Sequence, residues 1–496
     1  MILDEKEPFF RRLQDRVVFS RGSVVSGPVD VVVRYSELEP DSILGEILGT
    51  NATYASLKPV FEDRSDPLCK MESVFPNGPA RLSSSQVMLR SISERGWQEK
   101  EPANEPLDIV GQFECLDLLI DKRHPDRDFE LTARSTTFYL DEDVVLWRPD
   151  GLEFGSGAFT LRGEEGQEIT PGFECRFTMK GQPCLVYDGS RRPSSRRTLS
   201  SILPTVLCST TKPAAEYSDD TFLVEARALV DEVLLLASLA CRRVIRWHRY
   251  VVSGLHGLWT HVRSVQQHSG LSDRLEISAL PVQLYRFHEF VRLAIPKLRD
   301  FRRQDLDLEL PILYIVGSHE TARIDERFSC AVLCLERLVD LHARAQGLDH
   351  IVPAKVFDQI RRRLRTELEA SLAAVSEDAV GRSRAEAVAH MREKLTELNR
   401  LPFWALLSAL LDAYGVQWTD LYPPGLSRPT LLSTRNEFIH SSKKPSYKRL
   451  TREAHRVQAL CERVIFRMLG WEDPYSPPEY ARQWLVRPED EQGDAD

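Results

Sequence analysis

Apolar and polar side chains alternate with a period of two along several short stretches of the N-terminal half. Phe173–Met179 and Phe129–Arg134 show this alternation, which is typical of half-buried β-strands. Further candidate strands, separated by Gly, Pro, Asn and Asp turn residues, are Val29–Tyr35, Ile109–Leu116 and Ala158–Leu161. The pattern predicts a β-rich N-terminal domain, sandwich-like or barrel-like, over residues 1–205, and it contains no information on strand order.

From about residue 218 onward, apolar residues recur at intervals of three and four, which is the period of one face of an α-helix. The same spacing occurs from Phe222 to Ala240 and from Phe328 to Val339. It is clearest in the set Leu450, Ala454, Val457, Cys461, Val464 and Met468. We therefore expect an all-α C-terminal half, with a helical connecting region over 206–310, a helical bundle over 311–472 and an acidic tail over 473–496.

The composition narrows the class of protein. A chain of 496 residues with 42% hydrophobic and 28% charged side chains is typical of a soluble multidomain protein, and not of a disordered or collagen-like one. The longest apolar run of the helical half, Val233–Ala240, is far shorter than the roughly 20 residues needed to cross a bilayer. The N-terminus has no signal-peptide pattern, and nine scattered cysteines do not indicate a disulfide framework. We expect a multidomain α+β protein in the cytoplasm, with reduced thiols and no membrane partner.

The net charge of −9 argues against a uniformly basic nucleic-acid-binding protein, but the charge is unevenly distributed. Residues 421–470 contain ten Lys or Arg against three Glu, whereas residues 472–496 contain eight acidic residues against two arginines. A local excess of cations attracts phosphate groups. The segment 421–470 is therefore the candidate for contact with nucleic acid.

A second unusual segment, from Val233 to Ser272, has no acidic residue but contains five arginines interleaved with Trp247, Tyr250 and Trp259. Arginines and aromatic rings in alternation can clamp single-stranded nucleic acid. The same residues suit a helix between two domains, with the aromatic side chains inside and the arginines paired to acids elsewhere. We favour the second interpretation, because the segment joins the two halves of the chain.

The sequence lacks the motifs of metal, nucleotide and serine-hydrolase chemistry. It has no Cys-x-x-Cys pair, and His319-Glu320 begins a His-Glu-x-x-His motif without the second His. The glycine-rich stretch Gly151–Gly157 lacks the Lys-Ser/Thr of a phosphate loop, and no Gly-x-Ser-x-Gly is present. We therefore expect neither a metal nor a cofactor.

One candidate site remains, in the stretch Arg435-Asn436-Glu437-Phe438-Ile439-His440. An Arg and a His separated by four residues occur four times in this arginine-rich chain, so the spacing alone is not specific. This pair is distinguished by Asn436, by its basic surroundings and by its position before the final predicted helix, Leu450–Gly470. The motif resembles the signature of the HEPN superfamily, in which an Arg, often followed by a polar residue, precedes a His by four to six residues.

The setting of the motif extends this resemblance. Phe328–Val339, which contains Glu336, resembles the early helix of a HEPN bundle, and Leu450–Gly470 resembles its closing helix. The order of a β-rich half and a helical bundle is also similar to that of ApeA-type anti-phage proteins. The resemblance implies an endoribonuclease without a metal, acting on host RNA such as tRNA in anti-phage defence (abortive infection). It further implies a homodimer or higher homo-oligomer formed through the bundle, and a phage-derived trigger.

The chemistry of metal-free RNA cleavage explains the residue types. The reaction needs a base, an acid and a cation that binds the phosphate. Histidine exchanges protons near neutral pH, and arginine holds phosphate through two N–H groups. His440 is thus the predicted general acid or base, Arg435 the phosphate clamp and Asn436 the third member of the site. Positions 435 and 440 lie about 140° apart on an α-helix, so their side chains converge only if the helix ends at His440.

The predicted RNA-binding residues around the motif are Lys443, Lys444, Lys448, Arg449 and Arg452. Such a cluster supplies affinity for RNA without reading its sequence. Two other classes of function also fit the chain. One is a non-catalytic HEPN-like protein that binds RNA, a nucleotide or a protein partner, and the other is a structural subunit of a defence or RNA-processing assembly.

Overall fold

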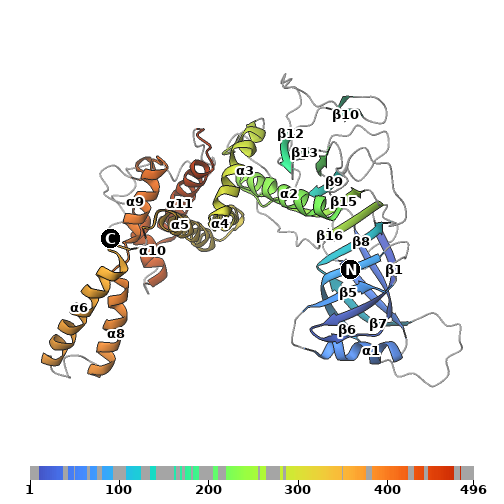
Figure 1. The fold of residues 1–496 in the computed structure, drawn as a ribbon, viewed down its shortest axis with the longest axis horizontal. Helices are drawn as coiled ribbons and strands as arrows, with labels where there is room; N and C mark the ends of the chain where they lie inside the picture. The colour runs from blue at the N-terminus through green and yellow to red at the C-terminus, as the bar shows by residue number, and fades with distance from the viewer. Residues whose placement is uncertain are drawn as a thin grey trace. The chain divides into compact units, whose positions relative to one another are not determined.

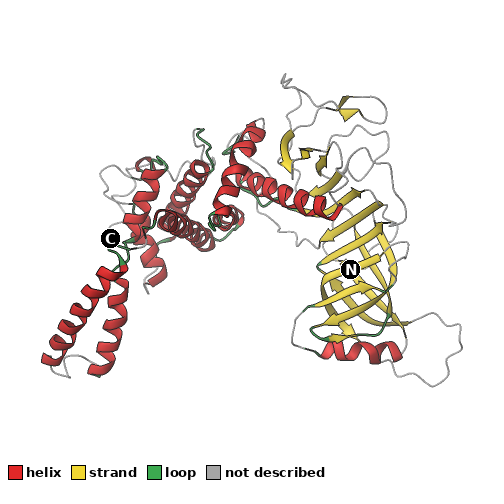
Figure 2. Ribbon diagram, in the orientation of Figure 1, coloured by secondary structure: helices red, strands yellow, loops and turns green. Residues whose placement is uncertain are grey.

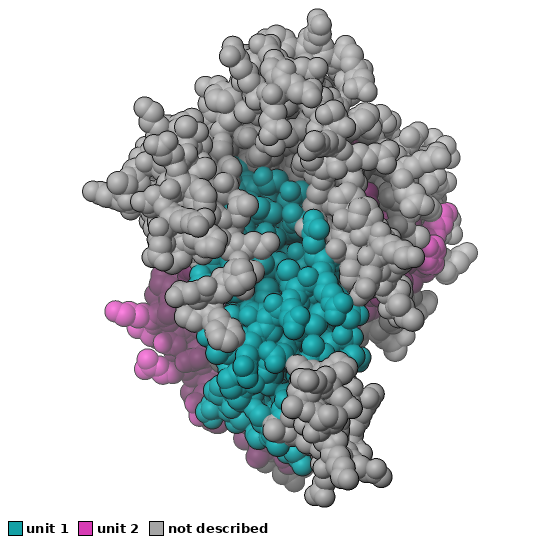
Figure 3. Space-filling model, turned by 90° about the vertical axis from the view of Figure 1, so that its right-hand side faces the viewer, with its two compact units in different colours: residues 1–241, 245–270, 282–292 teal, residues 242–244, 271–281, 293–496 magenta. Residues whose placement is uncertain are grey.

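A computed structural model gives the fold of the chain, and its strands and helices are shown in Figures 1 and 2. The chain divides into two compact units (Figure 3). Residues 1–241, 245–270 and 282–292 form the first unit, and residues 242–244, 271–281 and 293–496 form the second. The structure describes residues 10–36, 43–49, 51–63, 68–74, 81–92, 108–123, 135–140, 161–162, 168–169, 174–179, 182–188, 205–210, 219–254, 257–263, 280–282, 286–348, 350–375, 383–422, 429–440, 445–473 and 481.

The described strands of the first unit form an antiparallel sheet of fourteen strands, with a separate two-stranded ladder. The strands of the large sheet are β1 (Phe10–Arg21), β2 (Val24–Val25), β3 (Val29–Ser36), β4 (Ile43–Gly49), β5 (Cys69–Ser73), β6 (Arg81–Ile92), β7 (Asp108–Cys115), β8 (Asp117–Arg123), β9 (Ser135–Leu140), β12 (Glu174–Met179), β13 (Gln182–Asp188), β14 (Thr205–Thr210), β15 (Trp247–Gly254) and β16 (Gly257–Arg263). The ladder pairs β10 (Leu161–Arg162) with β11 (Glu168–Ile169), and the unit also contains helices α1 (Asn51–Glu62) and α2 (Asp219–Cys241).

The alternation of polar and apolar residues located several of these strands correctly. The predicted strands at 29–35, 109–116 and 173–179 are confirmed as β3, β7 and β12. The predicted strand at 129–134 lies outside the described residues, and of the one at 158–161 only Leu161 is described.

Six strands close into a barrel in the order β6-β5-β1-β3-β4-β7, with β7 pairing back onto β6. β6 belongs both to the barrel and to the sheet that continues beyond it, because two different strands, β7 and β8, pair with different parts of one edge of β6. Its C-terminal part, Val87–Ile92, pairs with β7, while its first residues, Arg81–Ser83, pair with β8. From β8 the sheet continues through β16, β15, β9, β14, β13 and β12. The β-rich domain predicted as a sandwich or barrel therefore contains a barrel.

A half-buried carboxylate stabilises the point where the sheet leaves the barrel. Asp117, the first residue of β8, accepts hydrogen bonds from the hydroxyls of Ser84 at 2.8 Å and Ser85 at 2.7 Å. It also accepts from the backbone N–H groups of Ser85 and Gln86, at 3.1 Å each. Burial opposes the charged form of Asp117, but hydrogen bonds from His261, Ser85 and Ser84 hold its pKa well below the usual range. The carboxylate of Asp117 thus joins the start of β8 to residues 84–86 of β6, at the point where β6 changes its pairing partner from β8 to β7.

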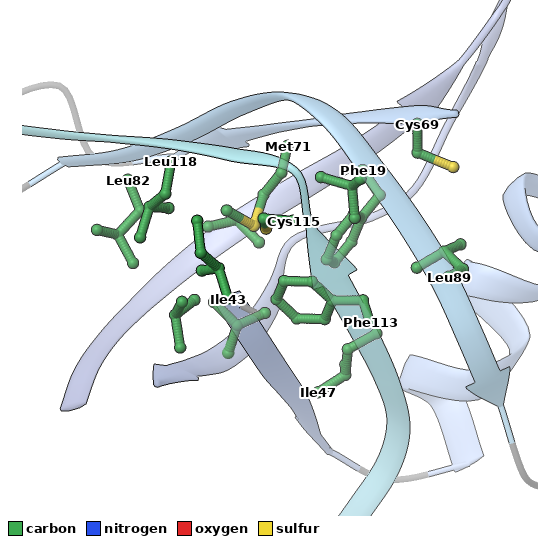
Figure 4. Close-up of a cluster of buried hydrophobic side chains, with 14 of the residues drawn as sticks. Phe19, Ile43, Ile47, Cys69, Met71, Leu82, Leu89, Phe113, Cys115 and Leu118 are labelled. Atoms are coloured by element: carbon green, nitrogen blue, oxygen red, sulfur yellow. The ribbon is translucent and has the colours of Figure 1, made fainter. Parts of the chain in front are cut away.

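The barrel core is built from the inward side chains of its strands (Figure 4). Buried residues alternate along β4, where Ile43 and Ile47 have no exposed surface. Phe19 of β1 and Phe113 of β7 meet edge to face, with ring centroids 5.2 Å apart. Leu57 of α1 joins the same cluster, so this helix covers part of the core.

Gly45 of β4 leaves the space that the Phe113 ring occupies. A Cβ atom at position 45 would lie 2.0 Å from this ring, well inside van der Waals contact. We expect Gly45→Ala to lower the free energy of unfolding of the first unit by about 1–3 kcal/mol, because the ring or the strand must shift. The control is Gly317→Ala, where the added Cβ meets nothing within 4 Å and no loss is expected. Thermal unfolding measures both changes, and equal transition temperatures for Gly45→Ala and the parent would contradict this account.

The prediction of a connecting helix through the acid-free segment Val233–Ser272 is wrong. Helix α2 ends at Cys241, and the following residues form the hairpin of β15 and β16, whose outer edges pair with β9 and β8. Trp247 and Tyr250 are buried in the first unit, and the guanidinium of Arg263 lies 3.4 Å from the centre of the Trp247 ring. Aromatic and β-branched residues favour strands, and here they extend the sheet. The rings of Trp247 and Tyr250 are therefore not exposed for stacking on nucleic acid.

The second unit is helical. Its described helices are α4 (Glu309–Glu320), α5 (Ile324–Gln346), α6 (Ala354–Ala374), α8 (Arg384–Glu397), α9 (Phe403–Ala413), α10 (Leu431–His440) and α11 (Tyr447–Met468), with a short 3₁₀ turn at Thr419–Leu421, and α3 (Phe287–Arg303) runs from the residues of the first unit into it. The helical stripes predicted at 328–339 and 450–468 are confirmed as parts of α5 and α11. Among the described helices, none is both long and apolar enough to cross a membrane.

Candidate functional site

Arg435 and Asn436 lie on α10, against the middle of α5. Nε of Arg435 donates a hydrogen bond to Oε1 of Glu336 at 2.6 Å, and Nη2 forms an ion pair with the same oxygen at 2.5 Å. Nη1 donates to Oδ1 of Asn436 at 3.1 Å. The guanidinium carbon lies 5.7 Å from the centre of the Phe403 ring of α9. Residues of three helices therefore orient one arginine.

Arg435 keeps part of its capacity to bind an anion. Its side chain is 26% exposed, and Asn436 beside it is exposed. Of the five N–H donors of a guanidinium, three are used by Glu336 and Asn436, which leaves one on each terminal nitrogen. Two parallel donors on a planar group match two oxygens of a phosphate. Glu336 neutralises the charge of Arg435 while it fixes the direction of these donors.

Aromatic packing by Phe438 sets the position of α10. The ring of Phe438 meets the ring of Phe328 on α5 edge to face, with centroids 5.4 Å apart. Leu431 and Thr434, earlier on the same helix, have no exposed surface. These residues attach α10 to the helical unit, and Arg435 follows directly after the buried Thr434.

His440 is the last residue of α10, and its side chain lies outside the described part of the structure, as do residues 441–444. The backbone is helical from Leu431 to His440. Positions 435 and 440 therefore lie about 140° apart around one helix. Convergence of Arg435 and His440 within a single chain stays a prediction.

The structure separates the predicted RNA-binding residues into different groups. Lys443 and Lys444 lie outside the described residues, and Lys448 is exposed. Arg452 is only 7% exposed, a placement in the interior of the helical unit that does not fit direct contact with RNA. Arg449 is half-buried and forms ion pairs within the protein.

Arg449 joins α11 to α10. Its Nη1 and Nη2 donate to the two carboxylate oxygens of Glu437 at 2.9 and 3.2 Å. Its Nε donates to Thr434 Oγ1, and Nη2 also donates to Ser433 Oγ, each at 3.1 Å. This arginine is therefore a structural residue that holds the helix of the Arg–His motif against α11.

We expect Arg449→Ala to lower the free energy of unfolding by about 1 kcal/mol, because the substitution removes a bidentate, partly exposed ion pair and two hydrogen bonds to hydroxyls. The neighbouring Lys448→Ala is the matched control and should change stability by less than roughly 0.5 kcal/mol. Urea unfolding followed by circular dichroism measures both. An equal effect of the two substitutions would show that Arg449 does not hold α10 in place.

The polar side of α11 is buried together with its apolar side. Glu462, with a side chain 1% exposed, accepts hydrogen bonds from Nε and Nη2 of Arg242 at 2.6 and 2.9 Å, and its Oε1 lies 3.0 Å from Nε2 of His319. Burial opposes the charge on Glu462, but Arg242 and His319 hold its pKa well below the usual range. Sequence reasoning missed this cluster, because its members are far apart in the chain and no local pattern relates them.

His455 is a second buried titratable group of α11. Its Nδ1 lies 3.1 Å from Oε1 of Gln458, whose Nε2 donates to the backbone carbonyl and the hydroxyl of Ser318, at 3.0 Å each. Burial, together with the charge of Arg327, lowers the pKa of His455 to about 4. His455 is thus neutral near pH 7, and it serves the packing of α11 against α4.

The lowered pKa of His455 predicts an acid-sensitive fold. Unfolded histidine takes up a proton near pH 6.5, whereas folded His455 does so only near pH 4, so its contribution to stability is complete above 6.5 and is lost as the pH falls toward 4. We expect the parent to lose about 2 kcal/mol from this group between pH 7 and pH 5. His455→Gln should flatten the pH dependence of urea unfolding, and His390→Gln, at an exposed position of α8, is the control for loss of a histidine elsewhere. Identical slopes for parent and His455→Gln would contradict the assignment.

No group of three or more His, Cys, Asp or Glu side chains within the described residues is arranged to hold a metal ion. Comparison of the chain with protein-family models, with curated proteins and with solved structures finds no match. The candidate site is therefore argued from its own residues: an oriented, partly exposed Arg435 with Asn436 beside it, on the helix that ends at His440.

Proposed function

We propose that the second unit is a metal-independent endoribonuclease of the HEPN type, in which Arg435 binds the scissile phosphate and His440 transfers protons. The observation that supports this proposal is the geometry of Arg435. Glu336 holds its guanidinium by Nε and Nη2, and one N–H on each terminal nitrogen is left beside Asn436. An arginine held in this way can bind two phosphate oxygens without losing its orientation.

The proposed reaction is transesterification within the RNA chain. A base removes the proton of the 2′-hydroxyl, the 2′-oxygen attacks phosphorus, and the bond to the 5′-oxygen breaks. An acid protonates the leaving oxygen, so the products are a 2′,3′-cyclic phosphate and a 5′-hydroxyl. Arg435 stabilises the charge that develops on the phosphorane, and Asn436, whose Oδ1 accepts from Arg435, donates through Nδ2 to the same group.

The backbone of α10 is helical as far as His440, and this limits how Arg435 and His440 can act on one phosphate. Because positions 435 and 440 are about 140° apart on α10, a single helix does not direct both onto one phosphate. We infer that two copies of α10 form the complete site, each supplying an Arg and a His. A composite site of this kind also supplies two histidines, one for each proton transfer.

The biological setting follows from the same resemblance. We propose that the enzyme acts on host RNA such as tRNA in the cytoplasm, and that the β-barrel unit responds to a phage-derived trigger. The combination of a barrel unit and a helical unit in one chain supports a division between sensing and cleavage.

Incubation of the purified full chain with total tRNA in EDTA tests the proposal. Cleavage that persists in EDTA and leaves 2′,3′-cyclic phosphate ends is the expected result. Cleavage that stops in EDTA, or products with 3′-hydroxyl ends, would contradict the mechanism.

The variant Glu336→Gln tests the role of Glu336. It keeps the shape of the partner of Arg435 but removes its charge, and it should reduce cleavage by misplacing the guanidinium.

A non-catalytic RNA-, nucleotide- or partner-binding protein is the second candidate function. The burial of Arg452 and the pairing of Arg449 with Glu437 favour it, because both reduce the positive charge available to RNA around Arg435. Retention of RNA on the protein without any cleavage in the same assay would support this alternative.

A further inference from the structure

The hairpin of α6 and α8 in the second unit has one face that is not covered by the described rest of the protein. The two helices lie side by side, and Arg392 of α8 donates to Glu369 of α6 at 3.0 Å. Phe357, Leu368 and Leu372 of α6 are half-buried and lie along one side of the helix. No residue of α6 is fully buried, so this 21-residue helix is covered along one side only.

The outward face of α6 carries large apolar side chains in its first half. Val356, Ile360 and Leu364 follow one another at intervals of four and are 46%, 41% and 39% exposed. An exposed helix is expected to carry polar residues on its solvent side, and a contiguous apolar stripe indicates an interaction surface. The first half of the face therefore presents apolar side chains that a partner could cover.

The second half of the same face is made of small residues. Ala370, Ser371 and Ala374 are all exposed, and they share an arc of about 120° with the apolar stripe of the first half. The same arc also contains Arg363, which directly precedes Leu364, and Glu367, which follows it, and both are exposed. Along the face the side chains follow in the order Val356, Ile360, Arg363, Leu364, Glu367, Ala370, Ser371 and Ala374.

This order is self-complementary. If a second α6 lies antiparallel on the first, with position 363 opposite position 367, then Ile360 lies opposite Ala370 and Val356 lies opposite Ala374. Val356 and Ile360 of each helix then meet alanines of the other, Leu364 meets Thr366, and Arg363 meets Glu367 twice. A surface in which each contact recurs by a two-fold axis is what an isologous dimer requires.

We propose that the outward face of α6 is a dimer interface, on which a second copy of this chain packs its own α6 in the antiparallel direction. The contact area of one helix pair is small, so we expect an affinity on the order of micromolar. RNA is the weaker candidate for this face, because the face carries an apolar stripe and includes the acidic Glu367. The interface involves α6 and not α10, and the proposal does not depend on the ribonuclease assignment.

Charge reversal provides a specific test with the full-length protein. In Arg363→Glu alone, two Glu–Glu contacts replace the two ion pairs, and in Glu367→Arg alone, two Arg–Arg contacts do. Like charges placed opposite one another should weaken self-association about tenfold or more in each single variant. An equimolar mixture of the two variants should associate again, because each Glu at 363 or 367 then faces an Arg. The double variant Arg363→Glu/Glu367→Arg should also recover the dimer.

Sedimentation velocity over a range of concentrations measures all of these samples, with Arg362→Glu as the control for charge on the other side of α6. Ile360→Glu should weaken association in the same assay, while circular dichroism confirms that the helices are retained. A parent chain that stays monomeric up to about 100 μM would overturn the proposal. So would a dimer that neither single variant weakens, or variants that fail to associate with each other. A shift that appears only when RNA is added would assign the face to nucleic acid instead.

Discussion

Replacing Glu462 by alanine is expected to lower the free energy of unfolding of the second unit by about 3–5 kcal/mol. Glu462 is the buried acceptor for Arg242 and His319, and the side chains of all three are at most 8% exposed. Removing the carboxylate leaves the guanidinium of Arg242 charged, buried and without these two hydrogen bonds. The loss of a buried charge partner is among the most destabilising single changes a protein undergoes, because the remaining ion cannot be hydrated.

The comparison that isolates this effect uses an exposed pair. Asp340 and Arg344 form an ion pair on the surface of α5, so Asp340→Ala should cost less than about 1 kcal/mol. Urea unfolding of the two variants measures the difference. Removing both charges with Arg242→Met and Glu462→Met should restore most of the stability, because neither buried charge then remains without the other. Equal costs for Glu462→Ala and Asp340→Ala would mean that the cluster does not stabilise the unit.

The pH dependence of the same variants has a definite sign. Burial alone would raise the pKa of folded Glu462, but the attraction of Arg242 and His319 outweighs it and holds this pKa well below the ordinary value of 4.5. The contribution of Glu462 to stability is therefore complete above pH 4.5 and is lost as the pH falls below this value. Glu462→Gln should remove this acid-induced loss, which distinguishes a titrating carboxylate from a side chain that only fills space.

Local periodicity predicted those strands and helices that bury one face and expose the other. β3 and β7 alternate between an inner and an outer face, β12 alternates in its sequence, and α5 and α11 show the helical period, so each is visible in the sequence. Closure of the barrel was not predictable, since the pairing of β1 with β5 and of β6 with both β7 and β8 depends on contacts between distant segments. The hairpin at 247–263 was predicted to be a helix because the segment joins the two halves of the chain, whereas its aromatic and β-branched residues favour strands.

The candidate site was predictable in part for similar reasons. The sequence singled out Arg435 and Asn436, and the structure adds the contact between Arg435 and Glu336, which is 99 residues away. Arg452 was expected to contact RNA because it belongs to the basic cluster after His440, and it lies on the polar side of α11, beside the apolar stripe. That side is buried as well, since its charges pair internally: Glu453 accepts from Arg456 at 3.0 Å and from Thr430 at 2.7 Å. Amphipathicity indicates which side of a helix is apolar, but not whether its polar side reaches water.

The largest effect on activity is expected from His440. If the proposed mechanism holds, His440→Ala removes proton transfer and should lower the single-turnover rate of RNA cleavage by about 10² to 10⁴. RNA affinity should survive, because the phosphate clamp of Arg435 is intact. His390→Ala, at an exposed position of α8, is the matched control and should cleave like the parent. A fully active His440→Ala variant would remove the catalytic assignment.

Substitutions of Arg435 and of the lysines should have consequences that differ from those of His440→Ala. Arg435→Lys keeps a charge but loses the planar pair of donors and the two-nitrogen pairing with Glu336, so it should cut turnover strongly and weaken binding only modestly. Joint replacement of Lys443, Lys444 and Lys448 by alanine should instead weaken binding and reduce its salt dependence, by roughly one unit of log–log slope for each phosphate that is no longer neutralised. Affinity across salt concentrations, measured beside single-turnover cleavage, separates these roles. If the lysine variant keeps its salt slope while His440→Ala loses RNA affinity, the segment binds RNA through the motif itself, and the division into clamp, proton carrier and basic surroundings is wrong.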